Sequence, residues 1–345
     1  TNGLPFSRLR HMTIRPHSEA PAVTVVITNY NGRRFLADCI DSVMSQTVKP
    51  AEIYVVDNAS TDGSTEFLTD TYPDVKLLEM GENAGFARAA NAGIRESTGD
   101  FIALLNNDAV ADRYWLEHLL RRIRGSEEIG FCASKMLFSW NKEMINNAGI
   151  GLTDYGLAYD RGLHVADGEA FANDQLVFGA CGGATLLRRR MLDRIGLFDE
   201  DFFLCYDDAD LSFRAQLMGY KCMYVANAVV YHAGGATVPY HGKTSRFHSC
   251  RHFIIVMAKN MPGQILLRRF GAISWFCLKN TARSFVEHRD LTNLRGYLSG
   301  IAAIKRNLKL RKQIQSRAAV TADYIRSMMV SREQMLRETS ARHSR

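Results

Sequence analysis

The sequence predicts an α/β fold, with a mostly parallel central sheet flanked by helices and a basic helical region after it. Between residues 23 and 108, apolar β-branched segments alternate with segments of helical apolar spacing, an order typical of βαβ units. Asn or Asp directly follows three of the four apolar segments, as at the turn that ends a strand. The chain has 345 residues, of which 46% are apolar and 23% charged, the composition of a globular protein with a buried core.

Four strands are expected in this part, over residues 23–28, 52–57, 75–78 and 101–105. The first is apolar on both faces, which is typical of a buried strand in a parallel sheet. A helix is expected between residues 35 and 46, and Pro50 then precedes the second strand. The cycle repeats, with a helix through Ala90 and Ile94 before the fourth strand.

The later part of the chain predicts a strand over residues 222–230 and a helix over 211–218, with Asp210 as its cap. We therefore expect three regions. A leader occupies residues 1–20, a sheet-containing domain 21–240, and a basic helical region 241–345.

Charge is distributed unevenly between these regions. From residue 241 onward, 21 Lys or Arg stand against five Asp or Glu, a balance of +16, whereas the preceding residues have a balance of −9. Such a region suits an anionic membrane surface or a nucleic acid, and a solvated helical face is the third interpretation. The apolar stretches are far shorter than the ~20 residues that span a bilayer. The seven cysteines occur singly, which favours reduced thiols over a disulfide framework or a zinc site.

Polar residues gather where the expected strands end. They are Thr28, Asn29 and Tyr30 after the first strand, Asp57 at the second, Asn83 and Gly85 after the third, and Asn106, Asn107 and Asp108 after the fourth. Because open α/β sheets bind ligands at the carboxyl ends of their strands, these residues predict a binding site. No G-x-G-x-x-G loop precedes Asp57, so a dinucleotide dehydrogenase is a poor interpretation.

Six segments, taken in order, resemble the family 2 inverting glycosyltransferases with the GT-A fold, within them the rhamnosyltransferases of cell-wall and O-antigen assembly. The segments are VTVVITNYNG, VVDNASTDGS, NAGFARAANAG, LLNNDA, GLFDEDFFLCYDDADLSFR and YHAGG, within about residues 22–237. Each segment is weakly specific, but the ordered set is highly specific. The resemblance implies transfer of a sugar from a nucleotide-sugar donor to a hydroxyl of a lipid-linked or saccharide acceptor.

The resemblance also implies where the sugar donor binds. The implied residues are Asp57, Thr28 and Tyr30 at a uracil or thymine base, and Asn83, Gly85 and Asn91 near the ribose and phosphates. The carboxylate of Asp57 would accept a hydrogen bond from the ring N–H, and the alternative is a cap before Ser60. Gly85 would let the backbone approach the donor closely.

A divalent cation, Mg²⁺ or Mn²⁺, is the cofactor that the resemblance implies. The cation would stabilise the charge on the departing diphosphate. Such cations prefer hard oxygen ligands. Asp108 ends the segment at the position of the family's D-x-D element, and His232 matches a histidine that closes the metal site in related enzymes. Asn106 stands where the family has its first Asp, and Asn106 and Asn107 are assigned to the sugar donor.

The acidic segment from Asp207 to Asp210 carries the expected catalysis. Clustered carboxylates repel one another, so at least one should have a raised pKa and accept a proton near neutral pH. By resemblance, Asp208 is the general base and Asp207 contacts the acceptor, while Gly182 and Gly183 leave room for the acceptor sugar. One base implies inversion in a single displacement, without the second catalytic carboxylate of glycosidases.

The expected sugar donor is dTDP-rhamnose, followed by UDP-sugars. A nucleotidyltransferase is the first alternative, but residues 29–34 are a poor version of its Gly-rich basic loop. A nucleic-acid-binding protein is the second, yet its motifs are missing and the acidic domain would repel phosphates. We therefore expect no nucleic-acid partner.

The basic region is expected to hold the enzyme at the cytoplasmic face of a membrane. Trp275 and Phe276 lie among Arg268, Arg269 and Lys279, a composition typical of a helix in a membrane interface. Packing on the catalytic domain and contact with a second copy of the chain are the alternatives.

Overall fold

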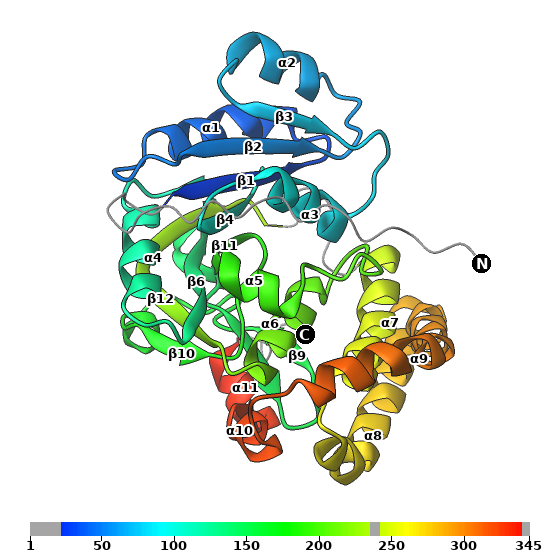
Figure 1. Cartoon of the computed structure of the whole chain (residues 1–345). Helices are drawn as coiled ribbons and strands as arrows, with labels where there is room; N and C mark the ends of the chain where they lie inside the picture. Colours follow the sequence, from blue (N-terminus) through cyan, green and yellow to red (C-terminus); the bar gives the residue numbers. More distant parts are fainter. Residues whose placement is uncertain (1–21, 235–241, 340–345) are drawn as a thin grey trace, which may run out of the picture.

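A ten-stranded sheet forms the centre of the molecule (Figure 1), as a computed structural model that describes residues 22–234 and 242–339 shows. Its strands are β1 (Val23–Asn29), β2 (Glu52–Asp57), β3 (Lys76–Glu79), β4 (Phe101–Asn106), β5 (Ala109–Ala111), β6 (Ile129–Phe138), β7 (Asn141–Asn147), β10 (Gln175–Val177), β11 (Ala184–Arg188) and β12 (Lys221–His232). The main order is β10-β12-β6-β11-β4-β1-β2-β3, with β7 beside β6 and β5 beside β12. The expected leader, residues 1–20, lies outside the described residues.

Helices and a small second sheet complete the described chain. The helices are α1 (Arg33–Met44), α2 (Ser64–Thr71), α3 (Phe86–Glu96), α4 (Trp115–Arg124), α5 (Arg189–Ile195), α6 (Asp207–Leu217), α7 (Lys243–Asn260), α8 (Gly263–His288), α9 (Thr292–Ser316), α10 (Ala322–Ser327) and α11 (Arg332–Glu338), with a 3₁₀ turn, η1 (Glu169–Phe171). The second sheet joins β8 (Ile150–Thr153) to β9 (Ala158–Asp160) and β13 (Met329–Val330).

The first four strands confirm the expected βαβ order, and their ends lie within one residue of the prediction. β1 pairs in parallel with β2 and β4, and β2 pairs in parallel with β3. The register aligns Asn29 with Asp57 and Thr28 with Asn106. The polar residues that end these strands therefore lie side by side at one edge of the sheet.

The second half of the sheet mixes strand directions. β11 runs antiparallel between β4 and β6, whereas β12 runs parallel to β6 and confirms the strand expected over 222–230. The end of β12 pairs with β5, which aligns His232 with Ala109. This pairing brings His232 next to Asp108, although more than a hundred residues separate them in sequence.

Alternating side chains of β1 serve the two faces of the sheet, as the two-residue period of a strand requires. Val25 and Ile27 pack in a core with α1 and α4, where Trp115 is fully buried. Val26 packs on the other face against apolar residues of α3, α5 and α6. Helices therefore cover both faces, as expected for this class of sheet.

The helix α6 begins four residues earlier than the sequence predicts, at Asp207 instead of Leu211. The prediction that Asp210 caps the helix was therefore wrong. Asp210 lies one turn inside α6, is 0% exposed, and pairs with Arg214 and Lys259. Its carboxylate is a buried counterion rather than a cap.

Helices α7, α8 and α9 form a lobe beside the sheet-containing part (Figure 1). Glycines at positions 296 and 300 let α9 approach α7 closely, because a Cβ on Gly300 would lie 2.6 Å from the carbonyl oxygen of Arg251. The chain then returns to the sheet-containing part, where β13 pairs with β8 and Glu338 accepts a hydrogen bond from Tyr159. Within the described ranges, the helices are all too short or too polar to cross a membrane.

Candidate active site

A cavity of about 390 Å³ opens at the carboxyl ends of β1 and β4, a volume within the usual range of ligand sites. Nine of the residues predicted from the sequence line it: Thr28, Asn29, Tyr30, Asn83, Gly85, Asn106, Asn107, Asp108 and His232. The other walls come from later segments, including Asn146, Asn147, Asp160, Cys181, Phe203 and Ser245. The cavity thus collects polar groups from strands that are far apart in sequence.

A chain of polar contacts links the ends of β2, β1 and β4. The amide of Asn29 donates to Asp57 Oδ1 at 2.7 Å, and Asn107 Nδ2 donates to Asn29 Oδ1 at 2.6 Å. Asp57 also accepts from the hydroxyl of Ser60 at 2.6 Å and is only 1% exposed. The direct base contact expected of Asp57 is not available in this arrangement, because its carboxylate faces Asn29 and Ser60 instead of the cavity.

The loop before α3 forms another wall of the cavity. Asn58 fixes this loop, since its side chain contacts the Asn83 side chain at 3.2 Å and accepts from the amide of Ala84 at 2.9 Å. Gly85 has a φ of 82°, and a Cβ there would lie 2.4 Å from the carbonyl oxygen of Phe203. The close approach that requires glycine is therefore to Phe203.

Asn91 does not reach the cavity, which contradicts its predicted role near the ribose and phosphates. It is 0% exposed on α3. Its Nδ2 donates to the carbonyl of Phe198 at 2.9 Å and to Glu200 at 3.0 Å, while its Oδ1 accepts from the amide of Phe198. Both ends of the amide are used to attach α3 to the segment that leads toward α6.

Asp108 and His232 meet at the cavity wall, as the motif analysis expected. Asp108 Oδ1 lies 3.0 Å from His232 Nε2, and both residues are less than 10% exposed. Asn106 Nδ2 lies 3.2 Å from the same nitrogen, and Asn146 Oδ1 lies 3.0 Å from His232 Nδ1. The pair is thus held by an amide on each side of the imidazole.

Asp160 is a cavity residue that the sequence analysis missed. It stands at the end of β9, and its Oδ1 accepts a hydrogen bond from Asn147 at 2.7 Å. Burial raises the pKa of Asp160 above its usual range, although Asn147 and His232 act in the opposite direction. No recognised motif surrounds this position, so only the pairing of β9 with β8 reveals it.

The two carboxylates at the start of α6 do not line the cavity themselves but lie next to residues that do, since Cys205 precedes α6 and Cys181 precedes Gly182. Asp208 is half-buried, and it accepts from the amide of Gly182 at 3.4 Å and from that of Ala209 at 2.7 Å. Burial and then Asp160 raise the pKa of Asp208 to about 6. Asp207 is 6% exposed, and burial followed by Asp208 raises its pKa well above the usual range. Its raised pKa gives Asp208 the basicity to take a proton near neutral pH.

Gly182 and Gly183 do not open the space that was expected for an acceptor. A Cβ on Gly182 would lie 2.8 Å from the Phe86 ring, and one on Gly183 would lie 2.9 Å from the Asn106 amide. The glycines therefore admit two side chains that line the cavity. Gly182 also points its amide at Asp208, a contact that any residue except proline would keep.

Comparisons with known proteins agree with this architecture. The profile described as Glycosyl transferase family 2 matches residues 24–196, half of the chain. The O-antigen biosynthesis protein RfbC of Myxococcus xanthus is 26% identical over 235 residues, which cover 64% of this chain and 18% of RfbC. A glycosyltransferase of Nostoc sp. is 34% identical over 133 residues, 36% of this chain and 40% of that protein. The chain thus matches less than half the length of these relatives.

A solved structure shows the same fold over nearly the whole chain. The mannosyltransferase PcManGT from Pyrobaculum calidifontis, in complex with GDP-Man and Mn²⁺, has a TM-score of 0.52 and 19% identity. The alignment covers 91% of this chain and 89% of that one. This likeness confirms the predicted GT-A architecture. The matched profile shows that the chain belongs to glycosyl transferase family 2.

Proposed function

We propose that the protein is an inverting glycosyltransferase that moves rhamnose from dTDP-rhamnose to a hydroxyl of a lipid-linked or saccharide acceptor. The main support for this reaction is the position of Asp208. It is a half-buried carboxylate of raised pKa, next to residues that line the cavity with Asp108 and His232. Membership of the family supports sugar transfer. The likeness to RfbC, an O-antigen biosynthesis protein, supports a role in polysaccharide assembly.

The proposed reaction is a single displacement. Asp208 accepts the proton of the acceptor hydroxyl as its oxygen forms a bond to the anomeric carbon of the donor sugar. The bond between that carbon and the diphosphate oxygen breaks, and its electron pair leaves with the diphosphate. Because attack comes from the face opposite the leaving group, the anomeric configuration inverts.

Asp108 and His232 fit a divalent cation at the diphosphate. Asp108 Oδ1 lies 3.0 Å from His232 Nε2 at the cavity wall, so both atoms could hold one cation in place of their contact with each other. The carboxylate of Asp108 is the kind of oxygen ligand that Mg²⁺ and Mn²⁺ prefer. Within residues 22–234 and 242–339, no three His, Cys, Asp or Glu side chains converge on one point, so water and phosphate oxygens would supply the remaining ligands. Bound there, the cation would stabilise the charge on the leaving diphosphate.

A panel of nucleotide sugars tests the proposed function together with its metal. We expect dTDP-rhamnose to give the fastest donor hydrolysis and transfer, UDP-sugars to follow, and excess EDTA to remove both activities. Asp108→Ala and His232→Ala should each raise the Mg²⁺ or Mn²⁺ concentration at half-maximal rate, because each removes a ligand. Nucleotide release measured against metal concentration gives this value.

The panel also separates the parts of the proposal. Rapid hydrolysis of GDP-sugars alone would contradict the dTDP-rhamnose assignment and leave sugar transfer intact. Full activity in EDTA would contradict the metal site. A Thr61→Ala variant is a suitable control, since Thr61 is exposed and does not line the cavity.

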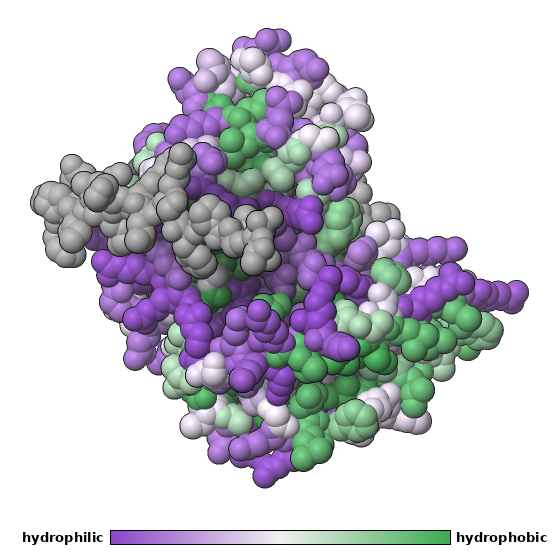
Figure 2. Space-filling model, turned by 45° about the vertical axis from the view of Figure 1, so that its right-hand side comes forward, coloured by the Kyte–Doolittle hydropathy of each residue, from purple (hydrophilic) through white to green (hydrophobic). Residues whose placement is uncertain are grey.

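The lobe of α8 and α9 supports the proposed membrane partner. Figure 2 shows a hydrophobic area on the side of the molecule where this lobe lies. Its exposed apolar residues on α8 are Leu267, Phe270, Trp275, Leu278, Phe285 and Val286, of which Leu267 is 81% and Trp275 68% exposed. Arg268 and Lys279 are exposed among them. Apolar side chains flanked by cations are typical of a helix lying in an anionic interface.

Vesicle binding tests this partner. We expect the protein to co-sediment with phosphatidylglycerol-containing vesicles more than with phosphatidylcholine vesicles, because each engaged cation contributes about 1 kcal/mol at an anionic surface. Trp275→Ser, and Arg268→Glu combined with Lys279→Glu, should both weaken binding, and high salt should weaken it further. Arg121→Glu combined with Arg124→Glu on α4, which also reverses two exposed charges, is the matched charge control. Equal binding to both lipids would contradict an electrostatic contact.

A further inference from the structure

The loop that leads into the proposed general base has an unusual backbone. Cys205 and Tyr206 have φ values of 65° and 67°, two consecutive residues in the left-handed region that favours glycine. Tyr206 immediately precedes α6, and Asp208 is the second residue of that helix. Such a backbone persists only where its surroundings hold it in place. The conformation of Cys205 and Tyr206 thus decides where the carboxylate of Asp208 lies.

One side chain of the C-terminal helices holds this loop. His252 on α7 is 0% exposed, and its Nδ1 lies 3.0 Å from the carbonyl oxygens of both Leu204 and Cys205. Its ring lies 4.5 Å from the ring of Phe202. Carbonyl oxygens only accept hydrogen bonds, so Nδ1 must carry the proton that it donates to them.

The other ring nitrogen of His252 is fixed as well. Arg251 Nη1 lies 3.0 Å from His252 Nε2, and because a guanidinium only donates, Nε2 must be the acceptor. These partners select one neutral tautomer. Burial lowers the pKa of His252 to about 4, and His248 and Arg251 act in the same direction. The imidazole therefore stays neutral while its Nδ1 proton is shared by the two carbonyls.

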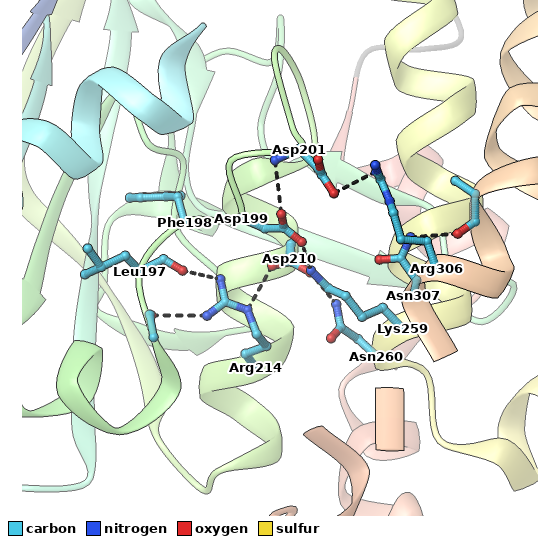
Figure 3. A network of polar contacts seen from close by, with 12 residues as sticks. Leu197, Phe198, Asp199, Asp201, Asp210, Arg214, Lys259, Asn260, Arg306 and Asn307 are labelled. Atoms are coloured by element: carbon cyan, nitrogen blue, oxygen red, sulfur yellow. Dashed lines mark hydrogen bonds and ion pairs between the residues drawn. The ribbon is translucent and has the colours of Figure 1, made fainter. Parts of the chain in front are cut away.

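A second attachment joins the end of α7 to the same segment (Figure 3). Lys259 Nζ lies 2.5 Å from Asp199 Oδ2 and 2.6 Å from Asp210 Oδ1. Asn260 Nδ2 donates to Asp210 Oδ1 at 2.7 Å. Contacts from α7 thus hold the segment from Asp199 to Asp210 on both sides of Asp208.

We propose that α7 positions the general base, and that His252 is its positioning residue. The Nδ1–H of His252 holds the carbonyls of Leu204 and Cys205 in the left-handed turn, and this turn starts α6 with Asp208 beside the cavity. The inference rests on the proposed role of Asp208 and extends the catalytic unit to a helix that lies beyond the matched profile, which ends at residue 196.

Two substitutions of His252 separate the two ring nitrogens. The amide nitrogen of Asn takes the place of Nδ1, whereas that of the longer Gln takes the place of Nε2. We therefore expect His252→Gln to lower kcat about 10- to 100-fold, as displacement of a catalytic group by about 1 Å does. His252→Asn should keep a kcat close to that of the wild type. The dissociation constant for dTDP, measured by calorimetry, should be the same in both variants and in the wild type.

A matched control distinguishes positioning from general loosening of the lobe. Ile254 lies on α7 and packs against Gly300 of α9. A Cβ added at Gly300 would lie 2.8 Å from the Cβ of Ile254. Ile254→Ala should lower the melting temperature and leave kcat and its pH profile unchanged. His252→Gln should lower kcat and move the acidic limb of the profile. Equal kcat losses in Ile254→Ala and His252→Gln, or equal kcat in the two His252 variants, would overturn the proposal.

A further variant keeps the test decisive if His252→Gln does not fold. Arg251→Gln changes a half-buried residue and removes the guanidinium that contacts Nε2 and disfavours protonation of the imidazole. We expect a smaller kcat loss with unchanged dTDP affinity, and unchanged kcat would overturn the role of His252. Failure of the base assignment looks different. An active Asp208→Asn enzyme would remove the proposed base, whereas an inactive Asp208→Asn beside a fully active His252→Gln would remove only the positioning role.

Discussion

Replacing Asp208 with Asn is expected to abolish transfer, with kcat falling by about 10²- to 10⁴-fold, the range for loss of a general base. Asn has nearly the same shape, and its one carbonyl oxygen can still accept from the amide of Ala209, which lies 2.7 Å from Asp208 Oδ1, although the contact of Oδ2 with the amide of Gly182 is lost. It cannot, however, accept the proton of the acceptor hydroxyl. The affinity for dTDP should therefore not change. Stopped-time assays at saturating substrate concentrations measure kcat, and nucleotide titrations measure the affinity for dTDP.

The pH profile gives an independent measure of the same group. Burial and Asp160 raise the pKa of Asp208 to about 6, and the base works only in its ionised form. The rate of the wild type should fall as the pH drops through about 6 and level off above it. Asp160→Asn should move this fall to lower pH, because it removes a negative charge that disfavours ionisation of Asp208.

The neighbouring carboxylate provides the control for Asp208→Asn. Asp207→Asn should raise the KM for the acceptor, since Asp207 is expected to contact the acceptor. It should keep a larger fraction of the wild-type kcat than Asp208→Asn does. Burial and Asp208 raise the pKa of Asp207, so this substitution should also increase thermal stability near neutral pH. Normal transfer by Asp208→Asn, with a large loss in Asp207→Asn, would assign the base to Asp207.

The largest expected effect on stability comes from Lys259→Met. Lys259 is 1% exposed and Asp210 is 0% exposed, so removing the cation leaves buried carboxylate without its main partner. Breaking one side of a buried ion pair typically lowers the free energy of unfolding by about 3–5 kcal/mol. Denaturant titration of the full chain, followed by circular dichroism, measures the change.

The dependence of this loss on pH follows from the pKa of Asp210. Burial alone would raise that pKa, but Lys259 and Arg214 outweigh burial and lower it to about 2. Ionised Asp210 therefore stabilises the fold above its unfolded pKa of about 4, and the contribution is lost as the pH falls toward 2. The difference between wild type and Lys259→Met should be largest near neutral pH and should narrow through this window.

An exposed ion pair in the same region is the control. Arg306 and Asp201 lie 2.7 Å apart, with side chains 58% and 44% exposed (Figure 3). Arg306→Met should change the free energy of unfolding by less than about 1 kcal/mol, as for most exposed pairs. If Lys259→Met changes stability by no more than this control, the network around Asp210 does not hold α7 to α6.

The sequence by itself determined the first half of the sheet and the place of the binding edge. Successive apolar residues identified β1 and β4, because strands buried on both faces must be apolar at successive positions. The alternation of strands and helices then identified β2 and the partly exposed edge strand β3. The ends of these strands then had to meet, since parallel strands share one carboxyl edge. Asn106 and Asp108 lie on the cavity for this reason.

Tertiary structure alone decided which polar groups face the cavity. Asn91 lies in a recognised motif, yet the carbonyl and amide of Phe198 occupy its side chain. Asp160 reaches the cavity from a short strand that carries no motif. His252 belongs to a helix whose sequence points to packing or a membrane, yet it holds the loop before Asp208. Apolar spacing is a local property that burial imposes on each element, whereas the partner of a buried polar group depends on which distant segment supplies its hydrogen bonds.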